Sequence, residues 1–206
     1  MQSIRYKILA RVRGTGKGYA FSSKDFLELG NRNLIDQSLS RLCKQDHIRR
    51  VITGIYDIPR KDDELGGTMS PDIHQVAKAI ARKNGLRIQP SGAEAANLLG
   101  LSTQVPAKVL YFTNGKSRAI KIGNRTLIFK RVEPRELNPG SEIGILVTQA
   151  LRFLGKEQSN ERIISYLKHK LAPSDRKKLL KDARYMEDWI WEAVRQIATE
   201  NKTGNI

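Results

Sequence analysis

The chain has 206 residues, of which 37 are Lys or Arg and 21 are Asp or Glu, so its formal net charge at pH 7 is +16. A basic excess of this size favours a polyanionic partner, and nucleic acid fits better than a membrane surface. No apolar run approaches the roughly 20 residues that span a bilayer and no signal-peptide core is present, so we expect a cytoplasmic protein without membrane contact.

A short helix is expected after a first, basic helix at the N-terminus. Ser22 or Ser23 can cap the start of this second helix, and Gly30 ends it. Gly30 and Asn31 then form a tight turn, which sets the following helix at an angle to the short one.

That following helix is predicted from the spacing of Ile35, Leu39 and Leu42. These residues recur at three- and four-residue steps, so they form one stripe that faces the core. The opposite side carries side chains that donate to phosphates or to base edges in a major groove. The side chains of this expected recognition face are Asn33, Gln37, Ser40, Arg41 and Lys44.

A basic β-hairpin is expected next, because residues 48–58 are rich in β-formers around Thr53-Gly54. Two helices followed by such a hairpin are typical of a winged helix-turn-helix, a DNA-binding fold. Residues 1–60 hold twelve Lys and Arg against five Asp and Glu, a net charge of +7. Contacts from the wing and to phosphates are expected from Arg49, Arg50, Lys7, Lys17 and Lys24.

Two plainer interpretations of these residues also exist. An amphipathic helix with Lys and Arg outside often serves only as a solvated face, although the further basic residues of this segment favour DNA. Residues 14–18, Gly-Thr-Gly-Lys-Gly, lack the spacing and the hydroxyl of a phosphate-binding loop, so we interpret them as a flexible turn.

Two domains are predicted from a stretch of linker-type residues within the chain. Residues 61–71 contain an acidic run, two adjacent glycines and a proline, which indicates an exposed linker. Residues 1–60 would then be the winged helix-turn-helix domain, and residues 72–206 an α+β domain that is helical from about residue 142. The fold class is therefore predicted to be α+β.

The second domain is expected to begin with a helix that ends at Gly85, followed by a short helix whose Ser91 and Glu94 have the spacing of a capping box. Three β-rich runs over residues 109–132 are joined by Asn-Gly and Gly-Asn turns, so an antiparallel meander is predicted. Its basic residues are a candidate second nucleic-acid surface, or else they only protect strand edges. They are Lys116, Arg118, Lys121, Arg125, Lys130 and Arg131.

The C-terminal part is expected to form three helices, over residues 142–154, 160–171 and about 174–200. The last of them carries an apolar stripe of helical period from Leu179 to Ile197. Core packing explains this stripe, and a dimer interface or a partner-binding face would need the same pattern.

No catalytic residue, metal site or cofactor is predicted. The three histidines, His47, His74 and His169, are far apart and belong to no cluster of metal-ligand spacing, and the single Cys43 excludes a multi-cysteine site. The acidic run at residues 62–64 lies in the expected linker, where a solvated charge run is the commoner explanation.

Over residues 5–135 the chain resembles the AbiEi-type antitoxins and their transcriptional-regulator relatives. The resemblance rests on the segment DFLELGNRNLIDQSLSRLCKQDHIRRVITGIYDIP and on the later VAKAIARKNGLRIQPSGAEAANLLG, with Gly54-Ile55-Tyr56 and the 90–106 stretch as its most specific pieces. It implies a winged helix that represses its own promoter at inverted repeats, and a C-terminal domain with antitoxin activity. The cognate toxin would resemble a nucleotidyltransferase, and no stable complex with it is presumed.

From the sequence we therefore expect a non-enzymatic, sequence-specific DNA-binding autoregulator that serves as the antitoxin of a bacterial type IV, phage-defence system. By position, the resemblance gives the recognition role to the helix face named above and the wing role to Arg49 and Arg50. The alternative is a nucleic-acid-processing enzyme or an RNA-binding accessory protein that uses the basic β-meander.

Overall fold

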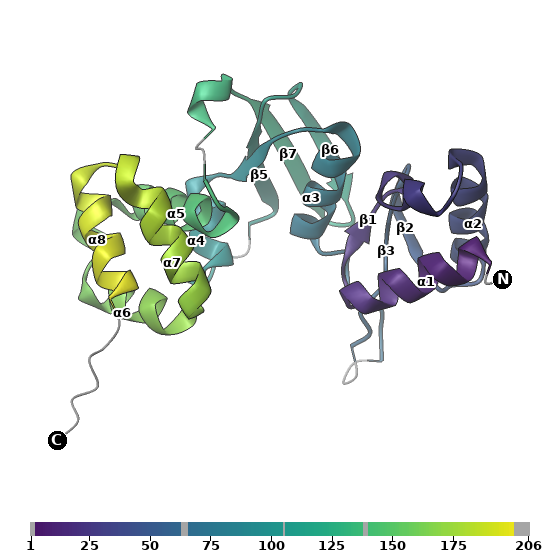
Figure 1. Cartoon of the computed structure of the whole chain (residues 1–206), viewed down its shortest axis with the longest axis horizontal. Coiled ribbons are helices and arrows are strands. Elements are labelled where there is room, and N and C mark those ends of the chain that lie inside the picture. Colours follow the sequence, from purple (N-terminus) through teal and green to yellow (C-terminus); the bar gives the residue numbers. More distant parts are fainter. Residues whose placement is uncertain (1–2, 63–65, 105, 138–139, 200–206) are drawn as a thin grey trace. The chain divides into compact units, whose positions relative to one another are not determined.

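Helices and strands mix along the chain, so the predicted α+β class is confirmed (Figure 1). The computed structural model describes residues 3–62, 66–104, 106–137 and 140–199. Contacts group the chain into two units. The first comprises Met1–Ile88, Ala107–Val109 and Thr113–Lys130, and the second comprises Gln89–Pro106, Leu110–Phe112 and Arg131–Ile206.

The first unit begins with two α-helices, a 3-10 helix and a small sheet. Its elements are α1 (Ile4–Thr15), β1 (Ala20–Phe21), the 3-10 helix η1 (Ser23–Leu29), α2 (Arg32–Lys44), β2 (Arg49–Ile52) and β3 (Ile55–Asp57). The sheet order is β1-β3-β2, with both pairings antiparallel. One core is shared by α1, η1, α2 and the sheet, and its largest side chains include Phe21, Phe26, Leu39 and Tyr56.

The start of η1 is fixed locally, as the sequence suggested. The Asp25 Oδ2 atom accepts hydrogen bonds from the backbone nitrogen of Ser22 at 2.7 Å and from its Oγ at 3.1 Å. Ser22 rather than Ser23 is therefore the cap, and the short predicted helix is a 3-10 helix.

The helix α3 (Ile73–Asn84) lies against β1, β3 and η1. Paired strand positions share a face, so Phe21 and Tyr56 face the helical core while their neighbours Ala20 and Asp57 face the other way. Ala20 is fully buried on this second face, consistent with cover by α3. Contacts therefore group α3 with residues 1–60, whereas the predicted boundaries of 1–60, 61–71 and 72–206 put it in the second domain.

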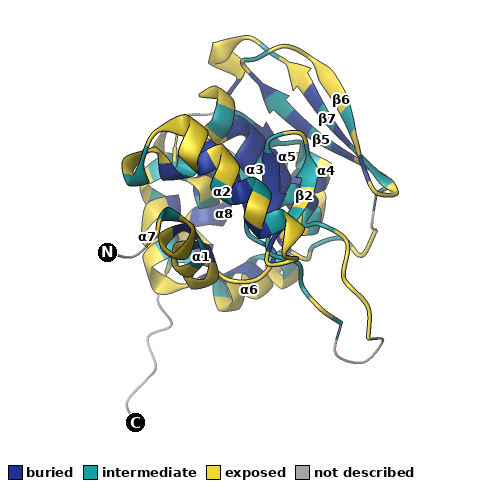
Figure 2. Ribbon diagram, turned by 90° about the vertical axis from the view of Figure 1, so that its right-hand side faces the viewer, coloured by how far each residue is buried: buried dark blue, intermediate teal, exposed yellow. Residues whose placement is uncertain are grey.

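A second sheet contains four strands in the order β4-β5-β7-β6. The strands are β4 (Ile88–Pro90), β5 (Lys108–Thr113), β6 (Arg118–Ile122) and β7 (Arg125–Arg131). The predicted meander is wrong, because β7 rather than β6 neighbours β5. Leu127 and Phe129 of β7 are buried and occupy an inner strand, whereas β6 is largely exposed and takes the edge (Figure 2).

The second unit is mainly helical. Its elements are α4 (Gly92–Leu98), the 3-10 helix η2 (Pro134–Glu136), α5 (Glu142–Gln158), α6 (Glu161–Lys170), α7 (Pro173–Asp182), the 3-10 helix η3 (Ala183–Tyr185) and α8 (Asp188–Ala198). Ser91 caps α4 by accepting from the Glu94 backbone nitrogen at 3.4 Å, which is one half of the predicted capping box. The Ser91 backbone nitrogen donates to the Leu110 carbonyl at 2.9 Å rather than to the Glu94 side chain. The helix α5 runs past its predicted end and kinks at Gly155, where φ is 79°.

The single long helix predicted from about residue 174 to 200 is wrong. The chain breaks after α7, and Met186 has an extended backbone before α8 begins. A straight helix of that length would span roughly 40 Å, at 1.5 Å per residue. Breaking it lets Leu179 and Val194 enter one core. Most of the stripe that the sequence also allowed as a partner face is buried there, and Met186 and Trp189 pack against that core partly buried.

Among the described residues, no helix combines the length and the apolar character needed to cross a membrane.

Candidate nucleic-acid interface

The helix α2 is anchored by a cap at its start and by one buried side. Asn31 caps its start by accepting a hydrogen bond from the Leu34 backbone nitrogen at 2.9 Å. Ile35, Leu39 and Leu42 are at most 1% exposed, so the predicted apolar stripe is confirmed. This anchoring fixes which side of α2 faces outward.

The outward side of α2 carries most of the predicted recognition residues. Asn33, Gln37 and Lys44 are exposed, and Ser40 is half-buried. The side chains of Asn33, Gln37 and Lys44 make no hydrogen bond or ion pair with any residue that the structure describes. Their donors are therefore available to a ligand.

Arg41 lies on the flank of α2 rather than at the centre of this face. It lines a hollow of about 300 Å³ between the start of α1 and α2, together with Arg5 and Leu34. Both arginines are exposed, and neither has an ion-pair partner in the described part of the chain. Arg5 was missed by the sequence reasoning, although its place near the start of a basic helix could have indicated it.

The two predicted wing arginines point to opposite faces of the small sheet. Arg49 pairs with Asp57 and Arg50 pairs with Tyr56 in the strand register. Arg49 therefore faces the α3 side, where its guanidinium binds Asp57, and this geometry gives it a structural role. Arg50 faces the side of α2, so only Arg50 extends the predicted recognition surface.

Arg50 is exposed and oriented by one aromatic side chain. Its Nη2 donates to the Tyr56 Oη at 3.2 Å, and its guanidinium carbon lies 5.5 Å from the centre of the Tyr56 ring. The hydrogen bond to Tyr56 raises the pKa of Arg50 above its ordinary value. The Tyr56 side chain therefore holds the charged guanidinium in one orientation.

The three remaining predicted phosphate contacts are exposed but scattered. Lys7 is two residues from Arg5 and so leaves α1 from nearly the opposite side. Lys17 precedes Gly18, whose backbone nitrogen donates to the Ile58 carbonyl at 2.8 Å, away from the Thr53-Gly54 turn. Lys24 lies in the first turn of η1. The structure thus gathers none of the three around α2.

A lysine of α3 lies at the tip of the hairpin, where sequence reasoning did not place one. The Lys83 Nζ donates to the Thr53 carbonyl at 3.4 Å. It also lies so near Gly54 that a Cβ there would clash with it, and Gly54 has a φ of +72°. No local pattern could have indicated this contact, because it joins residues thirty apart.

The basic residues of the second sheet do not share one face. Arg118 and Phe129 are paired, so Arg118 lies on the buried side of the sheet with its guanidinium carbon 5.2 Å from the Phe129 ring centre. Arg125 and Arg131 are an even number of residues from Phe129 along β7, so they lie on the same side as Phe129. Lys121 and Lys130 lie on the other side. Lys116 is exposed before β6. This arrangement favours edge protection over a single binding surface.

No metal-binding cluster is formed by the residues that the structure describes. No group of three or more His, Cys, Asp or Glu side chains among them could hold a metal ion. Of the acidic run at 62–64, Asp63 and Glu64 lie outside the described residues.

The comparisons with known proteins place the chain in one family. The sequence model of DUF6088, described as a family of unknown function, matches residues 7–179. The match covers most of the chain, which therefore belongs to this family. No curated protein matches the chain significantly.

Proposed function

We propose that the first unit is a winged helix-turn-helix that binds double-stranded DNA with sequence preference. In this proposal η1 and α2 are the helix-turn-helix, and β2 and β3 are the wing. The helix α2 enters the major groove with Asn33 and Gln37 toward the base edges. Arg50 and Lys44 lie toward the phosphates on either strand.

One observation carries this proposal: the basic residues of the first unit divide into paired and free ones. Arg11 is ion-paired with Glu28, Arg32 with Asp36 at 2.7 Å, and Arg49 with Asp57 at 2.6 Å. By contrast, Arg5, Arg41 and Lys44 have no acidic partner among the described residues. On the α2 side, unneutralised charge thus lies beside amide side chains that have no partner among the described residues.

A surface of this kind would bind DNA through two separable kinds of contact, one to phosphates and one to base edges. Lys44, Arg5 and Arg41 would supply phosphate contacts, whose strength falls as salt rises because bound counterions are released. Asn33 and Gln37 would supply base contacts, each good bidentate pair giving about 1–3 kcal/mol of discrimination against a wrong base.

The biological setting of the proposal comes from the resemblance to the AbiEi-type antitoxins. On that basis the target is an inverted repeat in the protein's own promoter, and occupancy of the repeat represses transcription. The second unit would then carry the antitoxin activity against a nucleotidyltransferase-like toxin. The alternative, an enzyme or RNA-binding protein that uses the second sheet, has less support because its basic side chains are split between two faces.

Substitutions on α2 test the proposed docking. Gln37→Ala should weaken binding to the protein's upstream DNA about tenfold while leaving binding to scrambled DNA nearly unchanged. Arg41→Ala should weaken both about equally, as expected of a phosphate contact on the flank. Lys156→Gln on α5 removes one exposed charge outside this surface and serves as the matched control.

Fluorescence anisotropy with labelled duplexes would measure these affinities at constant salt. If Gln37→Ala and Lys156→Gln have the same small effect on the upstream fragment, α2 does not read the bases and the docking is wrong.

A further inference from the structure

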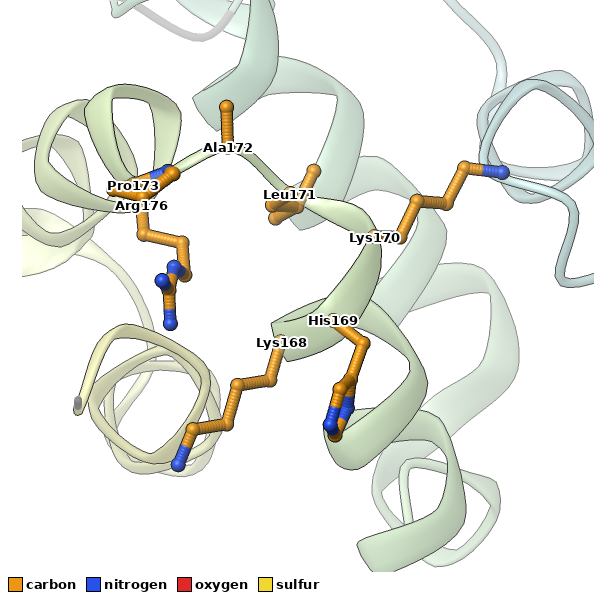
Figure 3. Close-up of a pocket in the computed structure, with 7 residues that line it drawn as sticks. All are labelled: Lys168, His169, Lys170, Leu171, Ala172, Pro173 and Arg176. Atoms are coloured by element: carbon orange, nitrogen blue, oxygen red, sulfur yellow. The ribbon is translucent and has the colours of Figure 1, made fainter. Parts of the chain in front are cut away.

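A cationic hollow lies where α6 ends and α7 begins, within the second unit (Figure 3). Its volume is about 600 Å³, and its wall includes the backbone connection at Leu171 and Ala172. Lys168 and Arg176 enter it from different helices, and His169 lies beside them, whereas Lys170 extends away from the other three side chains (Figure 3). Hollows of 300–1,000 Å³ are typical of small-ligand sites.

Lys168 and His169 have an ordinary structural explanation. Both lie in the last turn of α6, where the positive charge of Lys168 interacts favourably with the negative end of the helix dipole. The His169 Nδ1 contacts the Ser165 carbonyl oxygen at 2.7 Å, and because that oxygen only accepts, Nδ1 carries the proton. The Nε2 atom is then the ring nitrogen left for another partner.

Arg176 has no such explanation. It lies in the first full turn of α7, where the positive end of the helix dipole disfavours a cation, and Ala172 at the start of α7 provides no capping side chain. Its Nε is buried and has no hydrogen-bond partner, and no described carboxylate is ion-paired with the side chain. The nearby Asp175 is engaged by the Lys178 Nζ at 3.2 Å.

We infer that this hollow binds the phosphate groups of a small phosphorylated ligand. Unpaired positive charge from two helices gathers there, and no acidic side chain is among the described residues that line the hollow. A phosphate would accept hydrogen bonds from the Arg176 guanidinium and from the Lys168 ammonium, and arginine suits this role because its donors match two phosphate oxygens at once. A diphosphate or triphosphate chain fits the hollow better than a single phosphate, since the cations come from two helices.

This inference does not rest on the proposed DNA binding, because all the residues involved belong to the second unit. The full-length protein would be titrated with pyrophosphate and with ATP by calorimetry at constant ionic strength. Arg176→Gln and Lys168→Gln should each lower the affinity at least fivefold. Lys177→Gln, which removes the next charge on α7 but does not line the hollow, should change it less than twofold.

Amide chemical shifts of the labelled full-length protein would locate the bound phosphate. Shifts confined to residues 165–177 are the expected result, and circular dichroism would confirm that each variant is folded. If Arg176→Gln does not fold, Lys168→Gln carries the test alone. Shifts centred on α2, or equal losses in Lys168→Gln and Lys177→Gln, would overturn the inference. Binding of a short oligonucleotide here without binding of pyrophosphate or ATP would also overturn it, and would indicate a second nucleic-acid surface.

Discussion

Arg49 and Asp57 face each other across the hairpin and form a bidentate ion pair. The Arg49 Nε and Nη2 atoms lie 3.0 Å and 2.6 Å from the two carboxylate oxygens of Asp57. The Asp57 side chain is 1% exposed, and Arg49 also donates to the Met69 carbonyl at 2.9 Å. The pair therefore fixes the strand register and holds the chain that follows the hairpin.

Arg49→Ala should lower the free energy of unfolding by about 2–4 kcal/mol, because it leaves a buried carboxylate without its counter-charge. Urea unfolding followed by circular dichroism would measure the change. Arg50→Ala, on the neighbouring residue, should cost less than about 1 kcal/mol, since it removes an exposed cation–π contact and one exposed hydrogen bond, both to Tyr56. Equal losses for the two variants would show that the ion pair does not stabilise the hairpin.

Arg5 and Arg41 should each contribute one phosphate contact to DNA binding. Replacing either with Ala should reduce the slope of log affinity against log salt concentration by about one. Affinities for one duplex at four salt concentrations would give the slope. An unchanged slope in both variants would mean that the hollow between α1 and α2 lies outside the DNA interface.

Gly92 permits the close approach of α4 to α5. A Cβ at this position would lie 2.6 Å from the Phe153 Cβ and 2.9 Å from the Gln149 carbonyl oxygen. Gly92→Ala should therefore destabilise the second unit by about 1–3 kcal/mol. Thermal unfolding would detect the change. Gly123→Ala is the comparison, because an alanine there would strain only the backbone, at a φ of +57°, and would meet no neighbouring atom within 4 Å. A neutral Gly92→Ala would show that the two helices can separate freely.

His74 should make the first unit less stable in mild acid. Burial lowers the pKa of His74 below its ordinary value of 6.5, and Arg125 and Lys78 add to the effect while Asp72 opposes it. Below about pH 6.5 the unfolded chain therefore binds a proton at this residue more readily than the folded chain does. The stabilisation of the folded state by neutral His74 is fully present above that pH, and it is lost as the pH falls toward the folded-state pKa of His74.

Urea unfolding at pH 7.5 and at pH 5 would measure this dependence. The decrease in stability between the two should be smaller in His74→Gln than in the unsubstituted protein, whereas His47→Gln, at an exposed position, should leave it unchanged. A decrease of the same size in all three proteins would assign the acid sensitivity to other groups.

Local patterns predicted what depends on neighbours in sequence. The stripe of Ile35, Leu39 and Leu42, the cap at Ser91 and the hairpin turn at Thr53-Gly54 each follow from spacing within one element, and the structure contains all three. The outward face of α2 follows from the same spacing, because it is the side opposite the stripe.

Contacts between elements that are distant in sequence could not be predicted from local patterns. The order β5-β7-β6 is decided by which strand buries more apolar surface, and the break between α7 and α8 is decided by a core that the whole second unit shares. The role of Arg49 depends on which face of the sheet α3 covers. A charge pattern alone could not separate this structural arginine from the exposed Arg50.

Binding of the purified protein to its own upstream DNA and to a scrambled fragment, at two salt concentrations, tests the central claim most directly. The proposal predicts at least tenfold tighter binding to the upstream fragment at both salt concentrations, with both affinities falling as salt rises. Equal affinities for the two fragments would contradict sequence-specific recognition by α2 and would leave only a basic surface.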